Sequence, residues 1–558
     1  MKMNGAEILI ETLIDQGVTD VFGYPGGTVL DIYDAIYKRQ DRIHHVLTTH
    51  EQHAAHAADG YARSTGKVGV CIATSGPGST NLVTGIATAM LDSVPMVAIT
   101  GNVGRAMIGK DGFQEVDITG ITLPITKHNY FVNNVDELEE VVREAFKIAK
   151  SGRPGPVLID IPKDVQTEST DFQPRGVVSP FGRIAPSSRR IEEAAALIDQ
   201  AKKPYIYIGG GVVAAGVYDQ IKELADKIDA VIGTSLMGIS AIPTDHPRFL
   251  GMEGMHGHFA SSVAANEADC FIAIGTRFSD RATGNVKKFA KQASIIHFDV
   301  DYAEINKNIH ADVGVRGDLT LTMPELIQTV HASRHPEWIA HVGELRRKEK
   351  ALEPKDISVT PHAIMEVIND IRKPASPVVT DVGQHQMWAA QYLKFSQPRT
   401  FITSGGLGTM GFGVGAAVGS AVGTGEHTIL ITGDGSFSMN MNEILTAVEN
   451  KLPLTVVIMN NGVLGMVRQW QTLFYGKRYS NTVLTDRPVD YVKLAEAFGA
   501  KGVVTLSVDA FRDAFQAAYE GDGVTLIDCR IDKDEFVLPM LPPGGAIEDI
   551  ITEKGVDI

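Results

Sequence analysis

The chain has 558 residues, 44% of them hydrophobic and 21% charged, which is typical of a globular protein and long enough for about three to four domains. Its formal net charge of −16 argues against a nucleic-acid partner and against anionic membrane surfaces. The three cysteines are widely spaced, the N-terminus lacks the basic start of a signal peptide and no apolar run is long enough to span a membrane, so we expect a soluble, cytoplasmic protein with reduced core cysteines.

Short apolar runs alternate with stretches of helical spacing along the chain, a pattern that predicts parallel sheets. In chain order the runs form three blocks: KVGVCIA, PMVAITG and PVLIDIP; then PYIYIGG, ADCFIAIG and SIIHFDV; then PVVTDVG, TILITGDG and LTVVIMNN. A Pro-, Ser- and Gly-rich linker at 167–188 and a charged helix with a Pro-marked connection at 335–361 separate them. We therefore predict an α/β protein with three doubly wound parallel-sheet domains, at 1–170, 188–342 and 358–540.

Two features of this division stay open at the level of sequence. The first and third blocks each carry a Gly-rich loop after a strand, which makes them candidates for distant repeats. The tail at 538–551 has a Pro-Pro-Gly-Gly break before a short acidic helix, and both a flexible flap and a simple chain end fit that pattern.

Glu51 stands at the head of a predicted helix of small residues, HEQHAAHAADGYARST, which can pack closely against a neighbour. A carboxylate there gains from the helix dipole, and from this segment alone a cap or a surface charge is the more common interpretation. His53 and His56 are three residues apart without a third ligand nearby, so we interpret them as polar packing residues.

Glycine loops and one unusual tripeptide add further candidates. YPGGTV (24–29) and TSGPGSTN (74–81) follow strand-like runs and open helices, and GFQEVDI (112–118) places Phe-Gln-Glu in a loop before a helix. Arg153 precedes a predicted strand and Lys163 follows it. Loops carry function more often than strand interiors do, but none of these segments identifies a reaction by itself.

The third block gives the sharpest pattern. Gly433-Asp434-Gly435 follows one apolar run, Asn460-Asn461 follows the next, and helical spacing lies between them at 438–450. Such a βαβ unit has parallel strands, and neighbours lie about 4.8 Å apart, so Asp434 and Asn461 should meet at the carboxyl edge of the sheet. Carboxylate, amide and phosphate oxygens are the ligands that Mg²⁺ prefers. A turn with a helix N-cap is the plainer alternative.

Taken together, these motifs resemble the catalytic large subunits of acetohydroxyacid (acetolactate) synthases. GDG followed by NN resembles the thiamine diphosphate and Mg²⁺ fingerprint, and the HEQ helix resembles one of the same superfamily. GYPGG, TSGPG, FQEVD, GRPGPV, GMHG, TSGGLGTMG and LGMVRQWQTLFY match in order, between residues 4 and 545. The resemblance implies pyrimidine-binding, FAD-binding-like and diphosphate-binding domains, in that order.

The resemblance also implies a reaction. An enzyme of this family decarboxylates pyruvate and joins the remaining two-carbon unit to a second pyruvate or to 2-ketobutyrate, in branched-chain amino acid biosynthesis. Two alternatives remain: a pyruvate oxidase or another thiamine diphosphate-dependent carboligase, and a catalytically silent cofactor-binding protein on the same fold. The presence of both Glu51 and Asp434 argues against the silent protein.

Several residues receive roles at the coenzyme by this resemblance. Glu51 is expected to hydrogen-bond the aminopyrimidine ring and help its amino group act as a base. Met410 is expected to be the apolar wedge that bends thiamine diphosphate, and Asp434, Asn461 and the Val463 carbonyl to hold Mg²⁺. The remaining expected contacts to this cofactor are Tyr24, Pro25, Gly26, Pro77, Asn81, Gly383, Gln384, His385, Gly408, Gly435, Ser436 and Gly465.

The substrate side is also implied by resemblance. Trp470 matches a tryptophan that favours 2-ketobutyrate as acceptor, because an indole face offers apolar contact to the extra methyl group. Met466 and Phe113 are expected to complete that pocket. Arg281 is expected to hold the acceptor carboxylate, which a guanidinium can bind bidentately. Two further expected substrate-channel residues are Gln114 and Lys163.

The middle block resembles FAD-binding segments in GGGVVAAG (209–216), GMHG (254–257), GTRFSDRATG (275–284) and HFDVD (297–301). Because the reaction has no net redox change, the flavin is expected to be largely structural. The expected FAD contacts are Arg153, Gly209, Gly210, Gly211, Met255, His256, Gly275, Arg277, Asp299 and Asp318.

The chain departs from the family pattern at three places. Ser279 stands where aspartate is usual, which removes a charge near the expected flavin and weakens the FAD prediction. His53 stands where a small residue is usual, and Val414-Gly415 replaces the usual Leu-Pro, both of which affect packing.

The family resemblance further implies partner chains. The two halves of each cofactor site come from different subunits, so Glu51 of one chain would face Asp434 of another and a homodimer is the smallest active unit. Homotetramers and a separate small regulatory subunit are common in the family.

Overall fold

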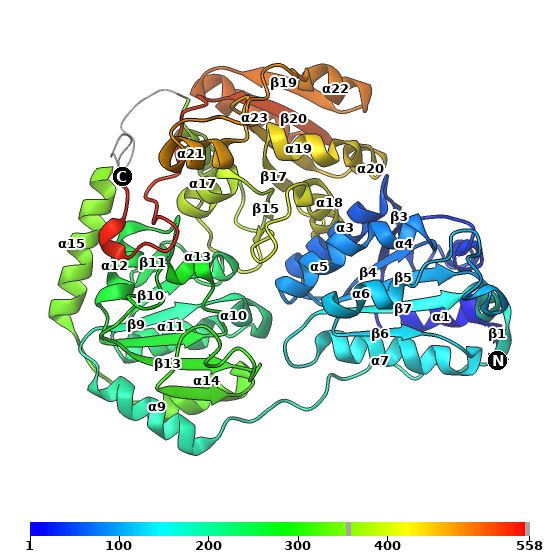
Figure 1. Ribbon diagram of the computed structural model, residues 1–558, viewed down its shortest axis with the longest axis horizontal. Coiled ribbons are helices and arrows are strands. Elements are labelled where there is room, and N and C mark those ends of the chain that lie inside the picture. The colour runs from blue at the N-terminus through cyan, green and yellow to red at the C-terminus, as the bar shows by residue number, and fades with distance from the viewer. Residues whose placement is uncertain (353–358, 553–558) are drawn as a thin grey trace.

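The computed structural model describes residues 1–352 and 359–552, and in these residues the strands form three six-stranded sheets that are parallel throughout. Figure 1 shows one sheet in the blue-to-cyan N-terminal part, one in the green middle part and one in the yellow-to-red C-terminal part. The prediction of an α/β protein with three parallel sheets is therefore confirmed. Residue 358, the predicted start of the third domain, lies outside the described residues, and the predicted domain limits stay predictions.

The N-terminal sheet has the order β3-β2-β4-β5-β7-β6. Its strands are β2 (Asp20–Tyr24), β3 (His44–Leu47), β4 (Gly69–Ala73), β5 (Met96–Asn102), β6 (His128–Phe131) and β7 (Pro156–Pro162). A small antiparallel pair, β1 (Lys2–Asn4) and β8 (Ser169–Asp171), closes the domain. The helices are α1 (Gly5–Asp15), α2 (Leu30–Tyr37), α3 (Glu51–Thr65), α4 (Pro77–Asn81), α5 (Val83–Leu91), α6 (Ile118–Thr122), α7 (Leu138–Lys150) and α8 (Lys163–Thr167).

The C-terminal sheet has the order β16-β15-β17-β18-β20-β19. When the strands of each sheet are counted along the chain, this order is the same as that of the N-terminal sheet. Its strands are β15 (Val378–Thr380), β16 (Phe401–Ile402), β17 (Thr428–Gly433), β18 (Leu454–Asn460), β19 (Lys501–Thr505) and β20 (Val524–Arg530). The helices are α16 (Pro361–Ile371), α17 (Gln384–Tyr392), α18 (Phe412–Thr424), α19 (Asp434–Asn440), α20 (Ile444–Glu449), α21 (Gly465–Phe474), α22 (Tyr491–Ala497) and α23 (Val508–Glu520). The shared order supports the interpretation of the two blocks as distant repeats.

The helix predicted between β17 and β18 is not continuous. It divides into α19, a 3₁₀ turn at Met441–Glu443 and α20. Asn440 leaves the helical conformation at the break, with φ −141° and ψ 23°. Its side-chain amide donates to the carbonyl of Gly411 at 2.5 Å, so a long-range polar contact interrupts the predicted helix.

The middle sheet has the order β11-β10-β9-β12-β13-β14, the strand order of dinucleotide-binding folds. Its strands are β9 (Pro204–Ile208), β10 (Val231–Thr234), β11 (Phe249–Met252), β12 (Cys270–Ile274), β13 (Ser294–Asp299) and β14 (Val313–Arg316). The helices are α9 (Ser188–Gln200), α10 (Gly210–Ala215), α11 (Tyr218–Lys227), α12 (Phe259–Glu267), α13 (Asp280–Thr283), α14 (Leu319–Thr329) and α15 (Pro336–Leu352).

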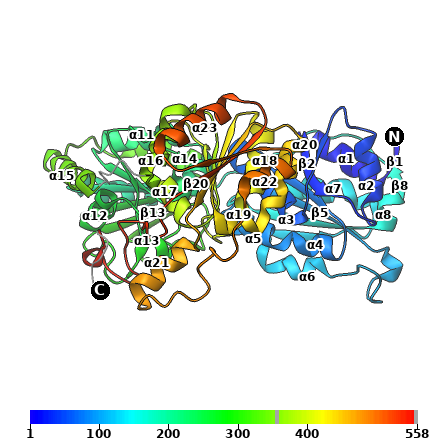
Figure 2. The same cartoon turned by 90° about the horizontal axis from the view of Figure 1, so that it is seen from above.

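Helices α3 and α18 join the N-terminal and C-terminal domains, and Figures 1 and 2 both show them side by side. A Cβ atom added at Gly60 would lie 2.1 Å from the carbonyl oxygen of Ala416, and one at Gly419 would lie 1.8 Å from that of Ala57. The small residues predicted to allow close packing on α3 therefore do so, and α18 is the neighbour.

The same helix pair explains two of the departures from the family pattern. His53 and His56 are buried, and burial lowers the pKa of both rings well below the ordinary value, so they pack as neutral side chains. A Cβ atom at Gly415 would lie 2.9 Å from the Cβ of His56 and 3.2 Å from Nδ1 of His53. The glycine thus makes room for the histidines.

Asp160 supplies a stability prediction in the core of the N-terminal sheet. It accepts hydrogen bonds from Oγ1 of Thr100 at 2.7 Å and from Nδ2 of Asn102 at 2.6 Å, and burial raises its pKa to about 7. Because the folded state holds this proton more tightly than the unfolded chain does, the carboxyl should cost about 3–4 kcal/mol of unfolding free energy as pH rises from about 4 to about 7.

Asp160→Asn should remove that dependence. Its thermal midpoint relative to wild type should therefore rise as pH is increased from about 4 to about 7, the interval between the pKa of this carboxyl in the unfolded chain and its pKa in the folded protein. Differential scanning calorimetry at several pH values measures the difference. A difference that does not change with pH would contradict the prediction.

Candidate active site

The predicted metal ligands meet at the carboxyl edge of the C-terminal sheet. Strands β17 and β18 are parallel neighbours, with Gly433 opposite Met459. Burial raises the pKa of Asp434 to about 6, and hydrogen bonds from the backbone N–H groups of Gly435 and Gly462 partly offset that rise. Asp434 therefore lies against the turn that carries Asn461 and Val463. Within that turn, the N–H group of Val463 donates to Oδ1 of Asn461 at 3.2 Å.

The two asparagines of the fingerprint have different partners. Asn460 is buried and donates to Oδ1 of Asp528 at 2.8 Å, on the neighbouring strand β20. Asn461 donates through Nδ2 to Oε1 of Gln384 at 3.3 Å. Gln384 in turn donates to Oε1 of Gln469 at 3.0 Å, so this residue, expected at the diphosphate, also orients Asn461. Of the pair, Asn461 is thus the member that contacts a residue expected at the diphosphate.

The edge beside Asp434 is shaped for an anion. His385 is buried, burial lowers its pKa to about 3, and its Nε2 has no hydrogen-bond partner in the described residues. A Cβ atom at Gly465 would lie 2.0 Å from Oε1 of Gln384, and one at Gly435 would lie 2.6 Å from Leu464. Ser436 is buried next to them, with Oγ 3.3 Å from Oγ1 of Thr432. A buried ring nitrogen without a protein partner, next to glycines, fits a polar group of a ligand such as a diphosphate.

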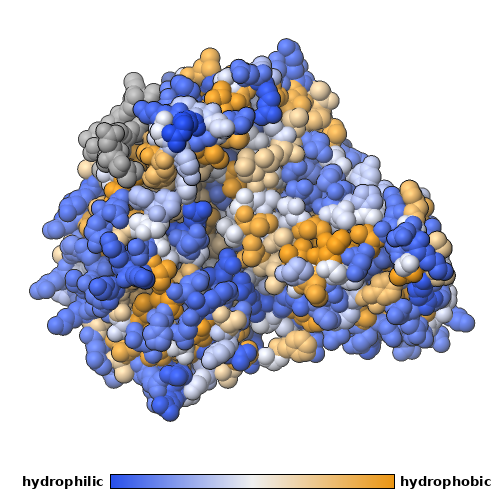
Figure 3. Space-filling model, in the orientation of Figure 1, coloured by the Kyte–Doolittle hydropathy of each residue, from blue (hydrophilic) through white to orange (hydrophobic). Residues whose placement is uncertain are grey.

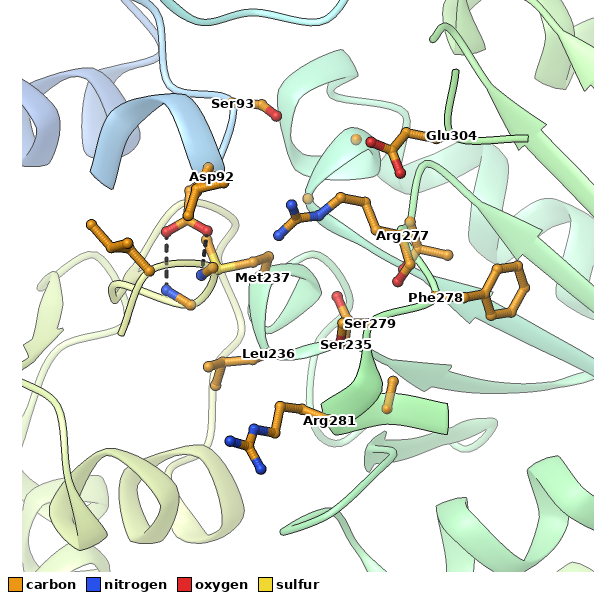
Figure 4. Close-up of a pocket in the computed structure, with 18 of the residues that line it drawn as sticks. Asp92, Ser93, Ser235, Leu236, Met237, Arg277, Phe278, Ser279, Arg281 and Glu304 are labelled. Atoms are coloured by element: carbon orange, nitrogen blue, oxygen red, sulfur yellow. Dashed lines mark hydrogen bonds between the residues drawn. The ribbon is translucent and has the colours of Figure 1, made fainter. Parts of the chain in front are cut away.

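A cavity of about 2330 Å³ opens beside this edge, between the middle domain, the C-terminal domain and one end of the N-terminal domain. Single-ligand pockets are usually about 300–1,000 Å³, so this volume can hold a large ligand and a substrate together. Figure 4 shows side chains of the middle domain, Arg277 and Arg281 among them, in the part nearest Asp92. The predicted residues that line the cavity are Arg153, Gly210, Gly211, Met255, His256, Gly275, Arg277, Arg281, Asp299, Asp318, Gly383, Gly408, Met410, Met466 and Trp470.

Arg281 and Trp470 come from different domains and meet in this cavity. The guanidinium carbon of Arg281 lies 5.6 Å from the centre of the Trp470 ring, and Nη1 lies 3.4 Å from the sulfur of Met255. Trp470 also makes an edge contact with Phe474, with ring centres 5.7 Å apart and ring planes at 78°. A cation over an aromatic face places a carboxylate-binding group beside an apolar surface.

The glycines of the middle domain lie where the strand order reverses. Gly209, Gly210 and Gly211 follow β9, and Gly275 follows the adjacent strand β12. A Cβ atom at Gly209 would lie 2.5 Å from the carbonyl oxygen of Gly275, and one at Gly211 would lie 2.7 Å from its Cα. These glycines therefore let two loops pack backbone to backbone at the switch point, where dinucleotides bind in such sheets.

Three of the polar residues expected at FAD, Arg153, Asp318 and Asp299, have protein partners here. Arg153 donates to Ser93 at 2.7 Å and to Glu304 at 2.6 Å, which ties the N-terminal domain to the middle domain. Asp318 caps α14 by accepting from the N–H of Thr320 at 2.9 Å.

Asp299 accepts from the N–H of Asp301 at 2.8 Å, and burial raises its pKa to about 6. His256 is buried, burial lowers its pKa to about 4, and its Nδ1 has no partner in the described residues. A neutral, unpartnered ring nitrogen in the cavity fits a polar ligand.

Glu51 is the first residue of α3. Its Oε2 accepts from Nδ2 of Asn81 at 2.9 Å, and a Cβ atom at Gly78 would lie 3.1 Å from its Oε1. Pro77 begins α4, the short helix that carries Asn81. The HEQ helix and the TSGPG loop thus build one local site around the carboxylate.

The other N-terminal candidates gather at the same strand ends. Lys163 donates to the carbonyl of Gly27 at 3.1 Å, which places it at the loop of Tyr24, Pro25 and Gly26. Gln114 has φ 61°, in the left-handed region that non-glycine residues rarely adopt, and its Cβ would lie 2.9 Å from one added at Gly76. Such strain is common at functional sites.

The N-terminal candidates and the cavity lie apart within one chain. In the part of the chain that the structure describes, the cavity is lined by none of Tyr24, Pro25, Gly26, Glu51, Pro77, Asn81, Phe113, Gln114 and Lys163. Phe113 is 89% exposed and Leu123 69%, and Figure 3 shows apolar residues gathered on the visible face of the N-terminal domain. The residues expected at the cofactor ring and in the substrate channel therefore do not line this cavity within one chain.

Sequence reasoning missed Asp92, Leu236 and Met237, which also line the cavity. Asp92 follows α5 at its C-terminal end, a position at which a polar residue is unremarkable in sequence. The two loop N–H groups that it binds, those of Gly405 and Gly406, lie more than 300 positions away, so no local pattern could have identified it.

Comparison with known proteins agrees with this architecture. Three family profiles match in order: "Thiamine pyrophosphate enzyme, N-terminal TPP binding domain" at residues 3–121, the central domain at 191–326 and the "C-terminal TPP binding domain" at 381–529. The fold and these three matches therefore define a thiamine diphosphate-binding protein.

Comparison with individual similar proteins identifies the family more closely. The chain is 46% identical over 553 residues to the acetolactate synthase isozyme 2 large subunit of Escherichia coli, covering 98% of this chain and 99% of the relative. It is 45% identical over 571 aligned positions to an acetolactate synthase of Mycobacterium bovis, covering 100% and 92%, and 44% identical over 574 to a probable large subunit of Methanocaldococcus jannaschii, covering 98% and 95%. The chain belongs to the acetolactate synthase large-subunit family. Within residues 1–352 and 359–552, no helix has the length and apolar character needed to cross a membrane.

Proposed function

We propose that this protein is an acetolactate synthase. It decarboxylates pyruvate and joins the remaining two-carbon unit to a second pyruvate, giving 2-acetolactate, or to 2-ketobutyrate, giving 2-aceto-2-hydroxybutyrate, in branched-chain amino acid biosynthesis. The observation that carries this proposal is the meeting of Arg281 and Trp470 in a cavity that Met410 also lines.

The metal edge would hold the cofactor. Asp434, the Asn461 side chain and the Val463 carbonyl supply three oxygen ligands for Mg²⁺, whose remaining positions suit diphosphate oxygens and water. His385 offers its unpartnered ring nitrogen to the diphosphate, next to Ser436. When bound, thiamine diphosphate supplies a carbon that adds to the 2-keto acid and accepts the electrons left by departing CO₂.

The chain's own groups direct the chemistry. Glu51 would hold a proton toward a ring nitrogen of the bound cofactor, which would make the cofactor's amino group a better base. Arg281 binds the acceptor carboxylate, and Trp470 presents an apolar face to the acceptor side chain.

FAD would occupy the part of the cavity formed by the middle domain. The support is the strand order, the glycines at its switch point and the unpartnered Nδ1 of His256. Ser279 lines this region where a carboxylate is usual. The visible absorbance spectrum of the purified protein tests the proposal: a flavin band near stoichiometric amount is expected, and a colourless protein that gains no band with added FAD would overturn it.

A second copy of the chain would complete each site. The support is that Glu51 and its neighbours do not line the cavity of their own chain, together with the exposure of Phe113, an apolar residue of the same domain. We propose a homodimer as the smallest active unit, with a homotetramer and a small regulatory subunit as further assemblies, and a cytoplasmic location. Analytical ultracentrifugation of the purified chain tests the dimer, and an active monomer would contradict it.

The assay that tests the function uses purified protein with thiamine diphosphate, Mg²⁺, FAD and pyruvate. Acetolactate should form, and 2-aceto-2-hydroxybutyrate should form when 2-ketobutyrate is added. Absence of both products would overturn the proposal. Acetate formation that depends on oxygen or an added electron acceptor would instead favour a pyruvate oxidase.

Trp470→Leu should change which acceptor is used. Loss of the indole face removes contact with the extra methyl group of 2-ketobutyrate, and one methylene in an apolar pocket is worth about tenfold or more in specificity. Competition between pyruvate and 2-ketobutyrate measures the product ratio. Tyr37→Leu, an exposed aromatic of the N-terminal domain, is the control and should leave the ratio unchanged. An unaltered ratio in Trp470→Leu would remove Trp470 from the acceptor site.

A further inference from the structure

The loop between β16 and α18 carries Gly408 and Met410 into the cavity, and its two ends are anchored in different domains. At its far end, the N–H of Gly411 donates to Oδ1 of Asp381 at 2.8 Å and its carbonyl accepts from Asn440 at 2.5 Å. Both of those partners belong to the C-terminal domain. Gly408 and Gly411 have φ values of 66° and 90°, so the loop turns sharply on either side of Met410.

The near end is anchored by the N-terminal domain. The N–H of Gly405 donates to Oδ2 of Asp92 at 2.9 Å, and that of Gly406 donates to Oδ1 at 2.7 Å. Figure 4 shows both bonds as dashed lines from Asp92 to the loop. Each carboxylate oxygen thus holds one of two consecutive backbone N–H groups, which fixes both the position and the tilt of the loop.

Asp92 is itself held firmly. Its side chain is fully buried, and Oδ2 accepts from Nη2 of Arg63 at 3.0 Å. The same guanidinium pairs with Asp59 one turn earlier on α3 and lies 5.4 Å from the ring of Phe412, the first residue of α18. A buried carboxylate between a guanidinium and two amides has little freedom to move.

A second contact between the same two segments lies closer to Met410. Oγ1 of Thr88, on α5, lies 2.8 Å from Oγ1 of Thr409, and both residues are buried. Helix α5 and its C-terminal Asp92 therefore contact the loop at Gly405, Gly406 and Thr409, and Met410 is the next residue.

We propose that Asp92 is a positioning residue that fixes how far Met410 projects into the cavity. Through Met410, it would also fix the bend of the bound cofactor. The inference rests on the proposed function, because it takes Met410 as the residue against which the cofactor bends. It gives the N-terminal domain two tasks: Asp92 acts on the site of its own chain, and Glu51 serves the site completed by another.

Asp92→Asn tests the inference because the two side chains have the same shape. The amide oxygen of asparagine can accept from one loop N–H group. The amide nitrogen is itself a donor, so it cannot accept from the other N–H group, and the charge attraction to Arg63 is lost. The loop should shift while Asp434, Asn461 and His385 keep their places. The affinity for thiamine diphosphate should therefore change by less than about threefold, whereas hydrogen–deuterium exchange at the reactive carbon of the bound cofactor should slow by about tenfold or more.

The experiment uses the full chain with Mg²⁺ and thiamine diphosphate, and no substrate. Tryptophan fluorescence quenching gives the affinity, and NMR of acid-quenched samples gives the exchange rate. Asp92→Glu keeps two acceptor oxygens and should recover part of the rate. Asp226→Asn, which removes an exposed partner of Arg248 at 2.7 Å in the middle domain, is the matched control and should exchange as wild type does.

Exchange at the wild-type rate in Asp92→Asn would overturn the inference, and so would equal slowing in Asp226→Asn. If Asp92→Asn does not fold, Thr88→Val removes the neighbouring contact without changing side-chain shape; it should slow exchange by about threefold, and an unchanged rate would overturn the inference. A wild-type protein that exchanges rapidly but forms no acetolactate would contradict the proposed function alone.

Discussion

Glu51→Gln should lower the rate of acetolactate formation by about 10²- to 10⁴-fold, the usual contribution of a general acid–base group. Glutamine keeps the size of the side chain and can still accept from Nδ2 of Asn81, which now lies 2.9 Å from Oε2. It cannot share a proton with the cofactor ring, so the amino group would no longer be activated. The steady-state rate with saturating pyruvate and thiamine diphosphate measures the effect.

The matched control is Glu140→Gln, which changes an exposed carboxylate on α7 that pairs with Arg175. Circular dichroism and cofactor affinity should be unchanged in both variants. A Glu51→Gln enzyme that keeps more than about a tenth of the wild-type rate would remove this carboxylate from the reaction.

Asp434→Asn should weaken thiamine diphosphate binding by about 100-fold or more at fixed Mg²⁺, because changes even to partners of metal ligands cost 10- to 100-fold. The substitution keeps the shape of the side chain but removes its charge beside the cation. Since Asp434 begins α19 at the sheet edge, no other carboxylate of that loop can replace it. Cofactor titration by fluorescence quenching measures the affinity.

Asp509→Asn, an exposed carboxylate on α23, is the control and should bind as wild type does. Raising the Mg²⁺ concentration should recover part of the lost affinity in Asp434→Asn. Wild-type affinity at limiting Mg²⁺ would contradict the assignment of Asp434 as a metal ligand.

Combining the two variants tests whether a site is shared between chains. If Glu51 and Asp434 of one site come from different subunits, a heterodimer with one Glu51→Gln chain and one Asp434→Asn chain has one intact site and one doubly impaired site. Purified through two affinity tags, it should show about half of the wild-type activity. An inactive heterodimer would place both residues of a site on the same chain.

The fold could be predicted from sequence where the strands are buried on both faces. Runs such as Thr428–Gly433 and Leu454–Asn460 are wholly buried, so their apolar character is continuous. Strands β3 and β19 lie at sheet edges, each has two exposed residues, and neither gives such a run. Strand β20 is buried almost throughout, and its run VTLIDCR has an apolar pattern that is also typical of a buried strand.

The candidate site divides in a similar way. Asp434 and Asn461 could be placed together because both follow neighbouring strands of one βαβ unit. The meeting of Arg281 with Trp470, and of Asp92 with Gly406, depends on how whole domains pack. The break of the helix at Asn440 also depends on a distant acceptor, Gly411. None of these contacts has a local signature.

The strand order shared by the N-terminal and C-terminal sheets indicates a common origin of these two domains. In each sheet the helix after the second strand, α3 in one and α18 in the other, occupies the same topological place, and these two helices pack on each other. The two helices therefore occupy equivalent places in the two sheets, as expected after duplication of one ancestral unit. Glu51 begins one helix and Met410 lies just before the other, so equivalent corners of the duplicated units have diverged into an acid and a hydrophobic support.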